Sequence, residues 1–193
     1  MKRLIIFDLD GTLIDSPQEE LGKKVWYEKT GEPYLHKGWW GRKESLDTEV
    51  FNIKPFPNVL AQLEKEKAIP DTKVIILTAR REKLRPYVEK ILNDNGIVVD
   101  DIILKRGNET KGDVILKIEN YNQDLDEIVV YDDFMNKNPE KIGEYTKIKD
   151  LLLPRVNYIL YYVENGNISL LESTDNILNV ITEEIIKFNH QYL

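Results

Sequence analysis

Two aspartates follow the first apolar run of the chain, residues 4–7, in the motif Asp8-Leu9-Asp10-Gly11-Thr12. Alternation along a strand end places Asp8 and Asp10 on the same side. One carboxylate can attack phosphorus to form an aspartyl-phosphate, and the second can protonate the leaving oxygen and then activate water. Gly11 allows a tight turn whose backbone N–H groups face a phosphate, with Thr12 beside it. The motif predicts a nucleophile and a general acid/base; the alternative is a turn with two solvated acids.

A second acidic pair, Asp132-Asp133, follows the apolar residues 128–131. Adjacent carboxylates repel each other unless a cation lies between them, and Mg²⁺ prefers such oxygens. We expect Asp133 as a direct metal ligand and Asp132 as a ligand or a support behind it. The Asp8 carboxylate and the Asp10 backbone carbonyl are predicted to complete the protein ligands. The alternative is a helix N-terminus that carries acidic residues.

Polar residues also follow the apolar residues 74–77, in the order Thr78-Ala79-Arg80. The Thr78 hydroxyl can donate to a phosphoryl oxygen. The Arg80 guanidinium can bind the same group, or another part of the substrate, in bidentate fashion. We therefore expect residues 78–80 to bind substrate, although a helix cap is the commoner role for Thr78.

A lysine is needed beside the nucleophile to offset the negative charge that collects there. Lys105 directly follows residues 102–104, whereas Lys111 follows Thr110 at the start of a predicted helix. A helix start suits a side chain held at the edge of a cleft. We therefore prefer Lys111, with Lys105 as a solvated loop lysine.

Short runs at residues 4–7, 74–77, 102–104 and 128–131 are apolar without alternation, which is typical of parallel strands covered on both faces. Helical patterns lie between them, near residues 58–65, 84–92 and 114–118. This alternation predicts an α/β fold with a mostly parallel central sheet and helices on both faces.

Two regions depart from this rhythm. Residues 15–55 contain three tryptophans and several Gly and Pro, and they indicate a small cap-like insertion after the first strand. Residues 158–163 and 168–171 flank an Asn-Gly pair and predict a β-hairpin. An amphipathic helix is expected after it, with apolar residues from Ile177 to Phe188 at helical spacing. Without repeats or linkers, residues 1–193 are predicted to form a single domain.

The insertion leaves the sheet beside the proposed nucleophile, so we expect it to set substrate choice. Trp39 and Trp40 can stack a nucleobase, and Arg42 can meet a phosphate or the leaving group. The alternative is that the two tryptophans form a small core that anchors the insertion.

Composition excludes several classes of site. The 193 residues contain no cysteine and two histidines, which excludes disulfides, thiolate nucleophiles and multi-histidine metal centres. Asp8 and Asp10 interrupt the N-terminal apolar run too early for a signal peptide, and no membrane-spanning stretch follows. We expect a cytoplasmic protein without an obligate protein partner. The net charge of −7 argues mildly against a polynucleotide substrate.

The four motifs in this order resemble the haloacid dehalogenase (HAD) superfamily: Asp8-x-Asp10-x-Thr12, Thr78, Lys111 and Asp132-Asp133, from residue 4 to about residue 139. The resemblance implies a Rossmann-like core, a Mg²⁺ cofactor and phosphatase activity. It also implies Asp8 as nucleophile, Asp10 as acid/base, and Thr78 and Lys111 as phosphate ligands.

A narrower resemblance is to the "Swiss army knife" RNA-repair-like HAD domains. It is carried by Gly38-Trp39-Trp40, Leu77-Thr78-Ala79-Arg80, Thr110-Lys111 and Tyr131-Asp132-Asp133. The Thr-x-Arg and Asp-Asp elements are also similar to the phosphatase half of phage-type polynucleotide kinase-phosphatases. These relatives imply a nucleotide or a nucleic-acid 3′-phosphate as substrate. Their pattern usually has Arg after the acidic pair, where this chain has Phe134.

These features predict a phosphomonoesterase of the HAD type that acts on a phosphorylated small molecule, a nucleotide or a nucleic-acid end. One alternative is phosphotransfer to an acceptor other than water; Asp10 favours hydrolysis because it can activate water. A second alternative is an inactive HAD-like module that only binds its partner.

Overall fold

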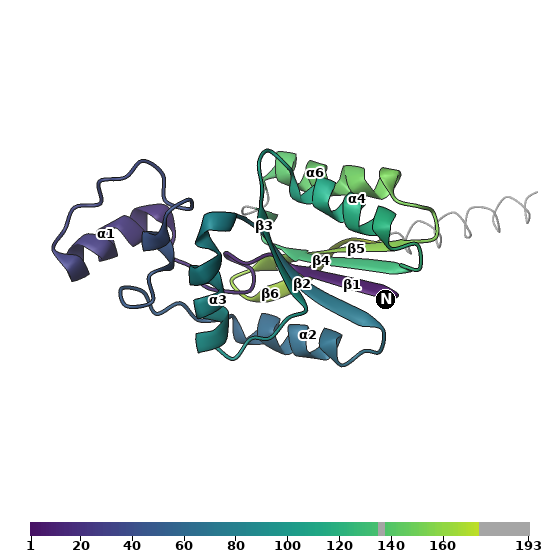
Figure 1. The fold of residues 1–193 in the computed structure, drawn as a ribbon, viewed down its shortest axis with the longest axis horizontal. Coiled ribbons are helices and arrows are strands. Elements are labelled where there is room, and N and C mark those ends of the chain that lie inside the picture. The colour runs from purple at the N-terminus through teal and green to yellow at the C-terminus, as the bar shows by residue number, and fades with distance from the viewer. Residues whose placement is uncertain (135–137, 174–193) are drawn as a thin grey trace, which may run out of the picture.

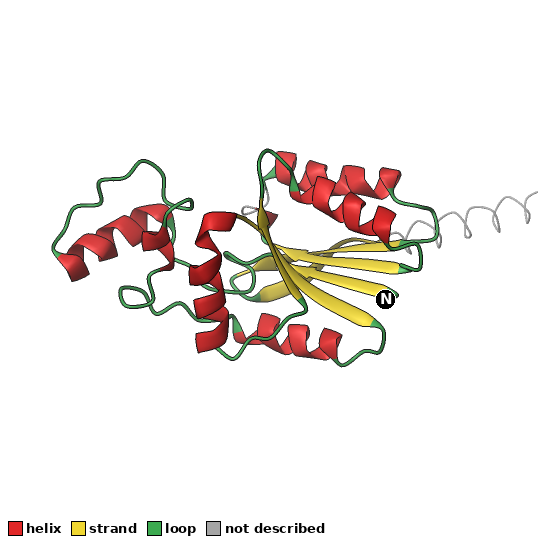
Figure 2. Ribbon diagram, viewed as in Figure 1, coloured by secondary structure: helices red, strands yellow, loops and turns green. Residues whose placement is uncertain are grey.

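The computed structural model describes residues 1–134 and 138–173, which fold as an α/β sheet with helices on both faces (Figures 1 and 2). The predicted fold class is confirmed. The strands are β1 Arg3–Phe7, β2 Thr72–Arg81, β3 Asp101–Lys105, β4 Glu127–Asp132, β5 Asn157–Glu164 and β6 Asn167–Ser173. The α-helices are α1 Glu19–Thr30, α2 Pro57–Lys67, α3 Arg85–Asp94, α4 Lys111–Tyr121 and α6 Pro139–Leu151, and the 3₁₀ turns are η1 Lys43–Leu46 and η2 Glu82–Leu84.

Strand β1 lies at the centre of the sheet. Within the described residues the strand order is β3-β2-β1-β4-β5-β6, and every pair is parallel except β5–β6. The chain moves outward from β1 to β2 and β3, and then crosses back to β4 on the other side of β1. The order therefore reverses at the carboxyl ends of β1 and β4, where open α/β sheets bind their ligands.

The two faces of the sheet explain why its strands are apolar without alternation. Along β1, Ile5 and Phe7 enter the core under α2 and α3, whereas Leu4 and Ile6 enter the core under α4 and α6. Figure 1 shows these two helix pairs on opposite sides of the sheet. A strand buried on both faces needs an apolar side chain at every position.

The C-terminal hairpin is confirmed. Asn165 and Gly166 between β5 and β6 have positive φ angles of 48° and 79°, which Asn and Gly tolerate best. The amphipathic helix expected over residues 177–188 lies outside the described residues. Helix α6 was not anticipated; Asn138 caps its start by accepting from the Glu140 N–H, and Pro139 occupies its first turn.

Residues 15–55 carry α1 and η1 and lie beyond the carboxyl ends of the strands, opposite the marked N-terminus in Figure 1. Their core is built on Trp39, whose indole N–H donates to the Pro17 carbonyl at 2.7 Å. A Cβ on Gly22 of α1 would lie 2.3 Å from the Trp39 ring, so the helix packs directly on the indole. Tyr34 and Phe51 complete the aromatic contacts.

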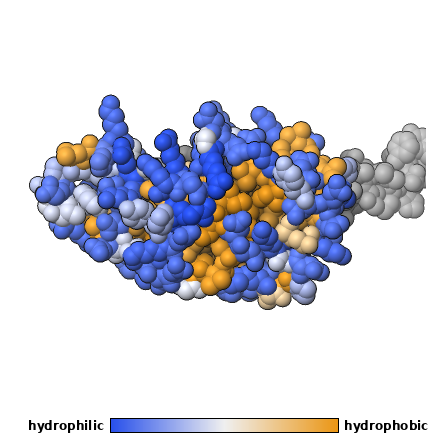
Figure 3. Space-filling view, in the orientation of Figure 1, coloured by the Kyte–Doolittle hydropathy of each residue, from blue (hydrophilic) through white to orange (hydrophobic). Residues whose placement is uncertain are grey.

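The surface in Figure 3 is mostly hydrophilic at the end that carries α1, and its apolar side chains gather near β2 and β3. Strand β3 forms one edge of the sheet, and its Ile102 and Ile103 are only partly buried. Among residues 1–134 and 138–173, no helix combines the length and apolarity needed to cross a bilayer.

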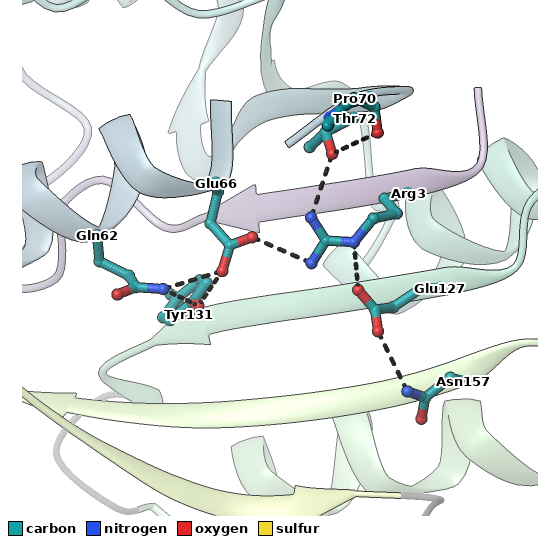
Figure 4. Close-up of polar contacts among 8 residues, drawn as sticks. All are labelled: Arg3, Gln62, Glu66, Pro70, Thr72, Glu127, Tyr131 and Asn157. Carbon is teal, nitrogen blue, oxygen red and sulfur yellow. Dashed lines mark hydrogen bonds and ion pairs between the residues drawn. The ribbon is translucent and has the colours of Figure 1, made fainter. Parts of the chain in front are cut away.

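A buried polar network joins the sheet to α2 (Figure 4). Arg3 donates to Glu66 at 3.1 Å and to Glu127 at 2.6 Å, and so links β1 to α2 and β4. Glu66, 6% exposed, also accepts from the Tyr131 hydroxyl at 2.7 Å and from Gln62 at 2.9 Å. Removing this carboxylate would leave buried donors without an acceptor, which costs more than a solvated ion pair contributes.

We expect Glu66→Leu to lower the free energy of unfolding by about 2–4 kcal/mol, because the Tyr131 hydroxyl loses its acceptor and Arg3 keeps only Glu127 of its two carboxylate partners. Glu64→Gln on the same helix is the control. It removes a solvated pair with Lys67 and should cost less than about 0.5 kcal/mol. Urea unfolding of both variants measures the difference, and equal losses would contradict the role of the network.

Candidate active site

Most of the residues predicted to carry chemistry line one cavity of about 920 Å³ at the carboxyl ends of the strands. Its floor holds Asp8 after β1 and Asp132 and Asp133 at the end of β4. Thr78, Ala79 and Arg80 from the end of β2 form part of its wall, and Lys111 enters from the first turn of α4. Strands far apart in sequence therefore deliver their polar ends to one place.

Lys111 joins the two acidic motifs. Its ammonium lies 2.6 Å from Asp8 Oδ1 and 2.7 Å from Asp132 Oδ2. Helix α4 fixes this position through a capping box in which Thr110 and Asp113 exchange hydrogen bonds. The preferred lysine therefore reaches the proposed nucleophile, whereas Lys105 is exposed at the rim of the cavity.

Burial dominates the electrostatics of this cluster. Loss of solvent raises the pKa of the Asp8 carboxyl to about 8, although the Lys111 ammonium opposes the shift; the charge of Asp132 adds to it. Burial alone lowers the pKa of Lys111, but Asp132 and Asp8 outweigh that effect and hold it above its usual value. The lysine therefore stays charged beside a carboxyl that resists ionisation.

The loop after β4 sets the direction of the acidic pair. Asp132 Oδ1 accepts the Phe134 N–H at 2.6 Å, and Thr12 Oγ1 accepts the Asp133 N–H at 2.9 Å. Phe134 is buried with a φ of 43°, a left-handed conformation that costs a bulky residue about 1–3 kcal/mol. Gly11 suits its place beside the loop because its φ of 73° lies in the left-handed region, and a Cβ there would also lie 2.8 Å from Asp133 Oδ2.

Tyr145 of α6 is a site residue that sequence reasoning missed. Its hydroxyl donates to Asp132 Oδ2 at 2.6 Å, the oxygen that Lys111 also contacts. Burial, and then the Asp132 charge, raise the pKa of Tyr145, which keeps the hydroxyl a donor. The available signal was the spacing of Ile142, Tyr145 and Ile148, which lie at i, i+3 and i+6 on one helix face.

The donor set fits a hard cation such as Mg²⁺. Carboxylate oxygens of Asp8, Asp132 and Asp133 all lie within 4.8 Å of one another. Mg²⁺ binds through one or two carboxylates plus water and substrate phosphate. The Asp10 side chain lies outside this group of oxygens, and the contribution of its backbone carbonyl stays a prediction.

Asp10 is held by Arg80. The Arg80 Nε and Nη2 groups donate to its two carboxylate oxygens, each at 2.8 Å, in a bidentate ion pair. Asp10 lies close enough to Asp8 for its charge to contribute to the raised pKa of Asp8. The Arg80 guanidinium, predicted to bind substrate, thus faces the proposed acid/base Asp10. The side chain of Arg80 is only 1% exposed.

The remaining predicted residues divide between cavity and core. Thr78 lines the cavity, and its Oγ1 accepts the Arg80 N–H at 3.2 Å; Ala79 lines the cavity as well. Of the two tryptophans, Trp39 is 1% exposed and lies in the core of the insertion, whereas Trp40 lines the cavity together with Arg42. Thr12 is fully buried and binds the Asp133 backbone.

Comparison with solved structures identifies the fold. The HAD domain of the effector protein Lem4 from Legionella pneumophila superposes with a TM-score of 0.51 at 16% identity, over 86% of this chain and 88% of that one. The chain has the HAD fold. A structure of a candidate β-phosphoglucomutase from Thermotoga maritima has a TM-score of 0.51 at 19% identity, over 81% of this HAD-fold chain and 84% of the other.

Two structures of the Pnkp1/Rnl/Hen1 RNA repair complex are also similar, with TM-scores of 0.45 and 0.44 at 20% and 19% identity. They cover 83% and 84% of this chain, which spans only 43% and 47% of theirs. The chain thus spans less than half the length of the repair-complex chains that it matches. No family model matches the sequence, and no curated protein matches it.

The raised pKa of Asp8 predicts a pH-dependent stability. An unfolded aspartate ionises near pH 4, whereas the folded one keeps its proton up to about pH 8. Between these values unfolding releases a proton, so the folded state loses stability as the pH rises. Asp8→Asn removes this penalty. We expect its gain in melting temperature, measured in EDTA, to be larger at pH 8 than at pH 5.

Asp113→Asn is a control whose effect on stability should depend on pH in a different way, because the pKa of Asp113 is lowered rather than raised. Hydrogen bonds from the Thr110 backbone and hydroxyl lower the pKa of Asp113, so its contribution is present at neutral pH and is lost in acid. This variant should melt below the wild type at pH 8 and approach it as the pH falls. A pH-independent effect of Asp8→Asn would contradict the burial of its charge.

Proposed function

We propose that this chain is a magnesium-dependent phosphomonoesterase that works through an aspartyl-phosphate on Asp8. The observation that carries the proposal is the placement of Lys111 between the carboxylates of Asp8 and Asp132 at the floor of an open cavity. A structural ion pair needs no cavity, whereas a nucleophile needs both charge compensation and access for its substrate. The HAD fold supports the assignment by analogy alone.

In the first step, an Asp8 carboxylate oxygen forms a bond to phosphorus while the bond from phosphorus to the ester oxygen breaks. A proton from Asp10 goes to the leaving oxygen. In the second step, Asp10 takes a proton from water, the water oxygen attacks phosphorus, and the bond to Asp8 breaks to release phosphate. Lys111 offsets the negative charge on Asp8 and the phosphoryl group, and the Thr78 hydroxyl is placed to donate to that group.

Mg²⁺ would be held by Asp8, Asp133 and Asp132, and when bound it would neutralise charge on the phosphoryl oxygens. Asp133 is the better direct ligand. The Asp132 carboxylate already accepts hydrogen bonds from Lys111, Tyr145 and the Phe134 N–H, which hold it in place. The binding of a cation would also favour the ionised form of Asp8, which is the form that attacks phosphorus.

The cavity rim favours a nucleotide or a phosphorylated nucleic-acid end as substrate. Five cationic side chains line it and have no ion-pair partner among the described residues: Lys37, Arg42, Arg81, Lys83 and Lys105. They supply the positive charge that binds phosphates beyond the one removed. The Trp40 ring, 36% exposed at the same rim, offers a flat face for a base.

The reaction is tested by phosphate release from p-nitrophenyl phosphate with Mg²⁺ and with EDTA. We expect turnover only with Mg²⁺, no turnover in Asp8→Asn, and a loss of about 10²- to 10⁴-fold in Asp10→Asn. Asp15→Asn, an exposed acid outside the cavity, is the control and should match the wild type. Near-wild-type turnover in Asp8→Asn would exclude the covalent mechanism.

The acceptor is identified in the same assay by adding glycerol at high concentration. Release of phosphate in equal amount to p-nitrophenol indicates water as acceptor. A shortfall of phosphate matched by glycerol phosphate would instead favour the phosphotransferase alternative. An intact, folded protein without turnover on any phosphoester would favour the inactive binding module.

The substrate class is tested with a 3′-phosphorylated oligonucleotide and with nucleoside monophosphates. Replacing Arg81, Lys83 and Lys105 together by Gln should raise the KM for the oligonucleotide about 10-fold or more and weaken its salt dependence, because phosphate contacts are lost. Turnover of p-nitrophenyl phosphate should change little. The control replaces exposed lysines outside the cavity by Gln: Lys24, Lys65 and Lys90. Equal effects on both substrates would contradict a role of the rim in strand binding.

A further inference from the structure

The Arg80 guanidinium has two sides that contact different parts of the molecule. One side holds both oxygens of Asp10, which fixes the plane of that carboxylate. On the other side, Nη1 donates to the Trp40 carbonyl at 2.6 Å and to Ser45 Oγ at 2.5 Å. One buried side chain therefore connects the proposed acid/base to residues 40–45 of the insertion.

Two residues of the insertion, Ser45 and Trp40, pack against the Arg80 guanidinium. Ser45 is fully buried, and its hydroxyl donates to the Arg42 carbonyl at 2.8 Å, which leaves its lone pairs to accept from Arg80. The Trp40 ring lies over the guanidinium, with 5.0 Å between its centroid and Cζ. Trp40 and Ser45 thus cover part of the Arg80 side chain, which is 1% exposed.

Strand β2 holds the backbone of Arg80 in a fixed position. Pairing with β1 ends at Ile76, whereas β2 continues to Arg81, so Arg80 stands on an extension beyond the central strand. The register with β3 shifts between Thr78 and Arg81, an irregularity of the kind that redirects side chains. The result is an arginine held at the end of the sheet and buried among the residues it joins.

We infer that Arg80 is a positioning residue for proton transfer, which orients Asp10 only while residues 40–45 are seated against it. The inference rests on the proposed function, because it assigns Asp10 the acid/base role. Proton transfer is sensitive to misplacement, and an error of about 1 Å costs on the order of 10²-fold in rate. Loosening the insertion therefore slows the steps that need Asp10 and spares the attack by Asp8.

The choice of leaving group separates these steps. An alkyl oxygen needs a proton to depart, whereas a dinitrophenolate does not. We expect Arg80→Lys to lower the kcat for glycerol phosphate about 10- to 100-fold, and Ser45→Ala about 3- to 10-fold, with little change in KM. With dinitrophenyl phosphate the same variants should release the first equivalent of phenol at nearly the wild-type rate. A slow phase should follow, because hydrolysis of the aspartyl-phosphate still needs Asp10.

Thr48→Ala is the matched control, since Thr48 lies in the same insertion and is not among the described hydrogen-bond partners of Arg80. It should leave both substrates unchanged. In the Asp10→Asn background, Arg80→Lys should add no further loss, because its effect passes through Asp10. A rise in KM alone, or a burst of phenol from dinitrophenyl phosphate that is slowed as much as the turnover of glycerol phosphate, would overturn the inference and make Arg80 a substrate-binding residue.

Hydrogen exchange tests the connection without any turnover. Asp10→Asn weakens the hold of Asp10 on Arg80, so we expect faster exchange of the amides of residues 40–46, whereas Asp15→Asn should have no effect. Unchanged exchange in Asp10→Asn would overturn the coupling even in an active enzyme. Absence of Mg²⁺-dependent phosphate release from the wild type would contradict the proposed function instead, so the two failures are distinguishable.

Discussion

The placement of the Lys111 ammonium between two buried carboxylates is the interaction on which the site depends. Asp8 and Asp132 lie 2.6 and 2.7 Å from it, and without a cation their charges would repel each other in a medium that solvates them poorly. The ammonium does not fully compensate, because burial raises the pKa of Asp8 in spite of it. Three carboxylates beside one ammonium offer ligands for a cation, and under the proposed function that cation would bind together with an anionic substrate.

The sheet topology makes this convergence possible. Reversal of strand order at β1 opens the carboxyl edge between β1 and β4, so Asp8 and Asp132 follow neighbouring strands without a connection passing over them. The apolar residues of β1 anchor both helix layers, and rigid strands therefore hold the acidic motifs. The strain at Phe134 and the close approach at Gly11 lie on the turns that follow these strands. At these two turns the irregular backbone sets the direction of the acidic side chains.

Local patterns predicted the sheet because each parallel strand contains a short apolar run, and the polar motifs follow these runs directly in the sequence. The same reasoning placed Lys111, since a capped helix start is also a local signal. It missed Tyr145 and Ser45, and it did not anticipate the ion pair of Arg80 with Asp10, because those contacts join residues 13, 35 and 70 positions apart. No spacing rule connects such pairs. Trp39 and Trp40 show the same limit, because adjacent identical residues can differ in burial when only the fold decides which one faces inward.

The distribution of charge over the surface also cannot be predicted from the sequence without the folded structure. A net charge of −7 argues against a polyanionic substrate only if the charges act as a sum. At physiological ionic strength the Debye length is about 8 Å, so a phosphate that enters the cavity interacts mainly with side chains at its rim. Arg81, Lys83 and Lys105 extend from the ends of strands β2 and β3 into that rim. The remainder of the surface carries the negative charge, so the proposed binding of a phosphorylated end at the cavity is compatible with weak nonspecific binding of polyanions elsewhere.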